Sequence, residues 1–72
     1  MVNKNLLKSA MIAKGYSSEM LADYLEISRQ SFSYKLNNKR PFSSNEISKI
    51  IHVLELNPEQ AVTIFFGKSV GE

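Results

Sequence analysis

One short stretch of this 72-residue chain carries polar and basic side chains at a spacing suited to molecular recognition. No acidic residue occurs from residue 27 to residue 45. Within that stretch, residues 29 to about 37 form an expected helix, with Phe32 and Leu36 as an i, i+4 pair facing a core. Its opposite side carries a polar strip at i, i+3, i+4 and i+7, with Arg29 at the edge of the strip. The strip consists of Gln30, Ser33, Tyr34 and Asn37.

These side chains suit the major groove of double-stranded DNA, which admits one helix and displays hydrogen-bond donors and acceptors. Arg29 can pair with the two acceptors of guanine, and Gln30 with the acceptor and donor of adenine. Ser33 can serve either role, while Tyr34 can offer its ring to a thymine methyl or its hydroxyl to a phosphate. We therefore expect these four residues to read bases.

Positive charge and helix ends near the same stretch predict contacts to DNA phosphates. The candidates are Ser18, Lys35, Asn37, Asn38, Lys39 and Arg40. The net charge of +2 is unevenly distributed, because residues 29–49 carry +4, residues 1–28 sum to zero and residues 50–72 sum to −2. The sequence is therefore polarised, with its positive part at the predicted recognition segment.

The rest of the sequence predicts helices that could position this segment, because apolar residues recur at helical spacing between turn signals. We expect an all-α, compact five-helix domain with helices over residues 4–14, 19–25 and 29–37, a fourth after Ser43 and a fifth after Asn57. The helix starts carry recognisable caps. These are Ser17 or Ser18, Ser28, Ser43 with Glu46 three residues on, and Asn57-Pro58 with Gln60. Gly15 and Gly67 are expected to end helices.

Residues 15–33, GYSSEMLADYLEISRQSFS, resemble the helix-turn-helix signature of the Cro and phage-repressor (XRE-like) family. The Leu21-Ala22 pair, the Ile27-Ser28 turn and the segment 35–39 have the expected offsets, and the resemblance covers roughly residues 4–66. It implies a lambda-repressor-like DNA-binding domain over residues 1–66 whose third helix reads the major groove, followed by a short tail at 67–72. The resemblance also implies base readers at Arg29, Gln30, Ser33 and Tyr34, and phosphate contacts at Ser18, Asn37, Lys39 and Arg40.

The sequence departs from the family pattern in three ways. Glu26 and Asn38 stand where glycine is common, which strains Glu26 if that position is left-handed, whereas asparagine tolerates this conformation. Met11 and Leu36 replace an Arg–Glu pair, so we expect the two side chains to touch in the core.

The fifth helix has a wider apolar surface than one core-facing stripe requires. Either both Phe65 and Phe66 close the core, or one ring stays exposed and forms a partner surface. Helix-turn-helix proteins usually act as dimers, so Val62, Phe65 and Phe66 are candidates for a weak homodimer or for dimerisation on DNA.

Other classes of function lack the residues they need. The chain has no cysteine and a single histidine, His52, so we expect no metal site and no cofactor. No combination of nucleophile, base and orienting group can be assembled, so we expect no enzyme activity. No signal peptide or membrane span is apparent, which favours the bacterial cytoplasm, with nucleoid association when bound.

Two functions remain as expectations. The first is a sequence-specific transcriptional regulator, a Cro-like component of a phage or prophage switch acting at operator sites. The alternative is an antirepressor or modulator that binds a repressor protein and masks its DNA-binding surface. The small net charge of +2 and the aromatic Tyr34 within the polar strip are also compatible with this alternative.

Overall fold

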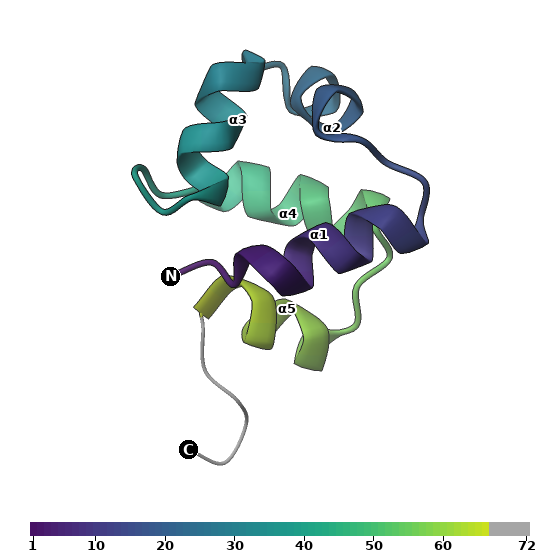
Figure 1. Cartoon of the computed structure of the whole chain (residues 1–72). Helices are drawn as coiled ribbons and strands as arrows, with labels where there is room; N and C mark the ends of the chain where they lie inside the picture. The colour runs from purple at the N-terminus through teal and green to yellow at the C-terminus, as the bar shows by residue number, and fades with distance from the viewer. Residues whose placement is uncertain (67–72) are drawn as a thin grey trace.

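Five helices make up most of residues 1–66, the part of the chain that the computed structural model describes. They are α1 (Lys4–Ala13), α2 (Ser18–Leu25), α3 (Arg29–Leu36), α4 (Ser44–Val53) and α5 (Pro58–Phe66). Residues 1–66 contain no strand, which confirms the predicted all-α class. In Figure 1, α2 and α3 form one end of the molecule, whereas α1, α4 and α5 pack at the other. None of the helices described is long and apolar enough to cross a membrane.

The helices begin where short polar side chains replace missing backbone partners. The Ser17 and Ser28 hydroxyls accept hydrogen bonds from backbone N–H groups at the starts of α2 and α3. At α4, Ser43 and Glu46 form a reciprocal capping box. Asn57 and Gln60 exchange the same pair of bonds before α5. The caps predicted from the sequence are therefore confirmed, while the predicted helix end at Gly67 lies outside the described residues.

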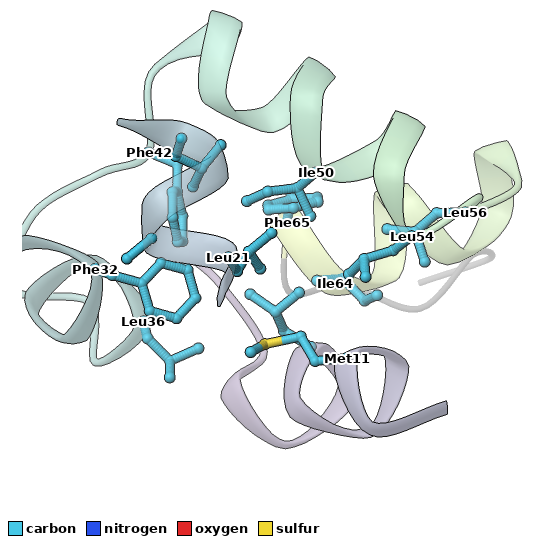
Figure 2. Close-up of a cluster of buried hydrophobic side chains, with 13 residues drawn as sticks. Met11, Leu21, Phe32, Leu36, Phe42, Ile50, Leu54, Leu56, Ile64 and Phe65 are labelled. Carbon is cyan, nitrogen blue, oxygen red and sulfur yellow. The ribbon is translucent and has the colours of Figure 1, made fainter. Parts of the chain in front are cut away.

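The core draws side chains from all five helices and from the loop before α4. Phe42, in that loop, packs edge-on against Phe32 of α3 and Phe65 of α5, with ring centroids 5.9 and 6.0 Å apart. Figure 2 shows these rings together with the aliphatic residues around them. Met11 and Leu36 are both buried in this cluster, as predicted, although direct contact between them remains a prediction.

Of the two alternatives for the last helix, the structure shows the second, in which one ring is exposed; Phe65 is therefore not part of a partner surface. Phe65 is buried against Phe42 and belongs to the core, because its position on α5 faces the other helices. Phe66, the next residue, is 62% exposed, and Val62 is 39% exposed. Since neighbouring helical residues point about 100° apart, one ring completes the core while the other remains at the surface.

Left-handed backbone occurs at four described positions. Gly15 has φ +77°, as predicted, and Glu26 has φ +62° and ψ +40° at the end of α2. Asn38 has φ +63° after α3, and Glu55 has φ +54° after α4. The condition for strain at Glu26 is therefore met, and Glu55 is a second strained glutamate with no counterpart in the sequence-based prediction.

The segment before α1 fastens two distant parts of the fold together. The Asn38 side chain accepts a hydrogen bond from Val2 N at 2.8 Å and donates one to Val2 O at 3.0 Å. Asn3 N donates to Ile64 O at 2.6 Å, and the Asn3 side chain caps α1. In Figure 1 the chain start accordingly lies between the loop after α3 and the end of α5.

Candidate nucleic-acid interface

The inner side of α3 holds the helix against the rest of the domain. Phe32 and Leu36 are almost fully buried, as the i, i+4 pattern predicts. Ser28 caps the helix start, and its hydroxyl also donates to Ser31 Oγ at 3.0 Å. Because these contacts fix both the position and the start of α3, its outer side chains project from a rigid frame.

All the predicted base-reading residues lie on the solvent side of α3. Arg29, Gln30 and Ser33 are exposed, and Tyr34 is 38% exposed. Gln30 Nε2 donates to Tyr34 Oη at 3.2 Å, so these two side chains lie together one helical turn apart. The structure therefore brings the predicted reading strip onto a single accessible face.

Two cations lie in the loop at the C-terminal end of this face. Lys39 and Arg40 are exposed in the loop after α3. Lys39 Nζ lies 5.5 Å from the Tyr34 ring centroid, a distance that permits a cation–π interaction. Both residues keep the placement expected of phosphate contacts. Ser18 is the first residue of α2 and only partly exposed, at a helix N-terminus separate from this loop.

Lys35 differs from the other predicted phosphate contacts because its charge is already paired. Its Nζ lies 2.8 and 2.7 Å from the two carboxylate oxygens of Glu46, and both side chains are largely buried. Burial alone raises the pKa of Glu46, but hydrogen bonds from Lys35 and Ser43 and the positive charge of Lys35 outweigh it and lower that pKa. We therefore do not retain Lys35 as a phosphate contact. Its contact joins α3 to the start of α4.

The two asparagines after α3 also have structural duties. Asn38 is exposed and uses its side chain to hold the Val2 backbone, and its role as a phosphate contact stays a prediction. Asn37 donates from Nδ2 to Ser33 O at 2.8 Å but remains exposed. Asn37 therefore remains part of the exposed outer face of α3, called the reading face below, together with Arg29, Gln30, Ser33 and Tyr34.

One cation of this face was absent from the sequence-based prediction. Lys4, the first residue of α1, donates from Nζ to Asn37 Oδ1 at 2.8 Å. The two residues are 33 positions apart, and neither periodicity nor local charge links them. Only the packing of the chain start beside α3 brings Lys4 to the reading face.

Three exposed acidic side chains precede α3 along the chain. Glu19, Asp23 and Glu26 are exposed on α2 and the turn that follows it. Lys39 and Arg40 follow the C-terminal end of α3, whereas Glu26 precedes its N-terminal end. Within residues 1–66, no group of three or more histidine or acidic side chains is placed to hold a metal ion.

The sequence also places the protein within a known family. Residues 5–68 match the family described as "Protein of unknown function (DUF739)". The chain belongs to this family. A comparison with curated proteins finds no match. The match spans the five helices except for Lys4, the first residue of α1, and the family description states no function, so the geometry of α3 and its surroundings is the basis for assigning one.

Proposed function

We propose that this protein is a sequence-specific double-stranded-DNA-binding regulator, a Cro-like component of a phage or prophage switch, and not an enzyme. The observation that carries the proposal is the exposed, acid-free outer face of α3. It presents Arg29, Gln30, Ser33 and Tyr34 on a helix whose inner side is buried. Cations at one end of this face complement phosphates, while amide, hydroxyl and guanidinium groups match base edges.

The mechanism follows from these two kinds of contact. Lys39 and Arg40 would bind backbone phosphates and set the orientation of α3, and the outer side chains would then test the base sequence. Occupation of an operator that overlaps a promoter would block transcription sterically. A helix of eight residues reads few base pairs, so a second copy on an adjacent half-site would supply additional specificity.

Selection from a random duplex library, followed by mobility-shift titration of the enriched duplex, tests the proposal. We expect enrichment of a defined sequence and binding that weakens steeply between about 50 and 200 mM salt. Gln30→Ala should relax preference at one base position by about 1–3 kcal/mol. Lys39→Gln should weaken all duplexes alike. Failure to enrich any sequence would refute sequence-specific binding.

A matched control separates local from global charge effects. Lys14→Gln removes the same charge as Lys39→Gln, but Lys14 lies at the far end of α1 and pairs with the exposed Glu55. Losing that surface pair costs little stability. The control should therefore bind nearly as well as the unchanged protein, and an equal loss in both variants would indicate a nonspecific effect of net charge.

The alternative function is an antirepressor or modulator that binds a repressor protein. The observation favouring it is the exposed apolar pair Val62 and Phe66 on α5. A mobility-shift assay with DNA upstream of the protein's own gene, with and without the neighbouring repressor, separates the two. A shift by this protein alone supports the regulator. No shift, together with loss of the repressor's shift, supports the modulator.

A further inference from the structure

The contact between Lys4 and Asn37 joins the start of α1 to the reading face of α3. The Lys4 ammonium lies 2.8 Å from Asn37 Oδ1, and Asn37 in turn donates to the Ser33 backbone. Lys4 is exposed. Its charge is thus held beside the predicted DNA-facing strip although it belongs to a different helix and a distant part of the sequence.

We infer that Lys4 is a DNA-binding residue whose ammonium contacts a backbone phosphate beside the C-terminal end of α3. This inference rests on the proposed DNA-binding function. It adds α1 to an interface that the sequence assigned to residues 18–40 alone. The ammonium has three donors, so a bond to Asn37 leaves donors for a phosphate oxygen.

The two residues before Lys4, Val2 and Asn3, are held by hydrogen bonds to Asn38, to Ile64 and to the first turn of α1. Val2 N donates to Asn38 Oδ1 and Val2 O accepts from Asn38 Nδ2, and Asn38 itself follows α3. Asn3 donates from its backbone to Ile64 O and caps α1 with its side chain. A charge on such an anchored backbone loses less conformational freedom on binding than one on a loose chain. Figure 1 shows this chain start directly beside the loop after α3.

The charges around this end of α3 support a phosphate role for Lys4. Lys35 is neutralised by Glu46, whereas Lys4, Lys39 and Arg40 are exposed. Lys4 touches Asn37, and Lys39 lies over Tyr34. Two ammonium groups therefore contact residues of the reading strip from different segments of the chain. A DNA backbone beside this end of α3 would meet both.

The test measures how the affinity for a mixed-sequence duplex depends on salt, because phosphate contacts do not depend on sequence. Lys4→Gln retains a side chain that can reach Asn37 but has no charge. We expect it to make the slope of log affinity against log salt shallower by about 0.9 per bound subunit, and to weaken binding about five-fold near 0.15 M salt. Lys4→Arg should restore both quantities.

Lys14→Gln is the charge-matched control at the opposite end of α1, about 15 Å away along the helix axis. An unchanged slope in Lys4→Gln, or a change equal to that in Lys14→Gln, overturns the role of Lys4 and leaves the proposed function standing. Asn37→Ala distinguishes contact from positioning, because the effect of Lys4→Gln should persist in that background. If it disappears, Lys4 acts only through Asn37 and the inference is wrong. Absence of any salt-dependent binding by the unchanged protein would refute the proposed function itself.

Discussion

The left-handed turn after α2 allows a direct test of backbone strain through the substitution Glu26→Gly. Glu26 has φ +62° and ψ +40°, a region where the Cβ of an L-residue clashes with the backbone. Its side chain is exposed and makes no hydrogen bond or ion pair within residues 1–66. Its backbone N–H bond to Asp23 O, at 3.0 Å, is available equally to glycine. The substitution therefore removes strain without removing a native contact.

The magnitude follows from two opposing terms. Relief of the left-handed conformation is worth about 1–2 kcal/mol. Glycine also increases the entropy of the unfolded chain, which costs about 0.4–1 kcal/mol. We expect Glu26→Gly to raise the free energy of unfolding by about 1 kcal/mol. For a domain of this size, such a gain raises Tm by about 4–8 °C, measurable by circular dichroism or calorimetry.

The controls are substitutions at positions that share the left-handed backbone conformation but differ in what the side chain contacts. Glu26→Ala keeps the Cβ and should leave Tm nearly unchanged. Glu55→Gly, at φ +54°, should raise Tm less because it also removes the ion pair with Lys14. Asn38→Gly should lower Tm, since asparagine tolerates φ +63° and its side chain holds Val2. A fall in Tm for Glu26→Gly, or an equal rise for Glu26→Ala, would refute the strain argument.

Three further predictions concern the core and the surface. Glu46→Gln should destabilise the domain by about 1–3 kcal/mol at neutral pH, because it leaves the largely buried Lys35 ammonium unpaired; urea unfolding measures this. The pKa of Glu46 is lower in the folded protein than its unfolded value near 4.5. The Glu46 carboxylate therefore contributes its full stabilisation above that unfolded value, and this stabilisation is lost as the pH falls through the folded-state pKa. The difference in unfolding free energy between Glu46→Gln and the unchanged protein should accordingly become smaller at that acidic pH. Phe42→Ala should cost about 3–5 kcal/mol in the same assay, because it removes a buried ring that contacts two others, whereas Phe42→Leu should cost less. Phe66→Ala should change the free energy of unfolding by less than about 0.5 kcal/mol, because Phe66 is exposed. A sedimentation coefficient lower than that of the unchanged protein at the same high concentration would identify Phe66 as a self-association contact.

Local signals in the sequence were sufficient to predict the helices and their starts. Short polar residues before each helix satisfy backbone groups within three positions, so their role can be read without knowing the tertiary structure. The Ser43–Glu46 capping box is the clearest example. The outward placement of Gln30 and Ser33 also followed from helical periodicity, because Phe32 and Leu36 fix which side of α3 is buried.

What the sequence could not predict depends on contacts between separate elements. Glu46 was assigned only a capping role, yet it also pairs with Lys35 eleven positions away. Lys4 and Asn38 acquire their partners through the placement of the chain start. Phe65 and Phe66 are adjacent and equally apolar, so composition alone did not distinguish the buried ring from the exposed one.

The hydrogen bond between Asn3 N and Ile64 O has a consequence for how the domain is assembled during synthesis. It joins the beginning of α1 to the end of α5, and Phe65 beside it closes the core over Phe42. The ribosome synthesises α5 last among the described helices. Until α5 has emerged, the nascent chain lacks the Phe65 ring that packs against Phe42. We expect chains that stop before Pro58 to be protease-sensitive, with folding completed in one late cooperative step once α5 has emerged.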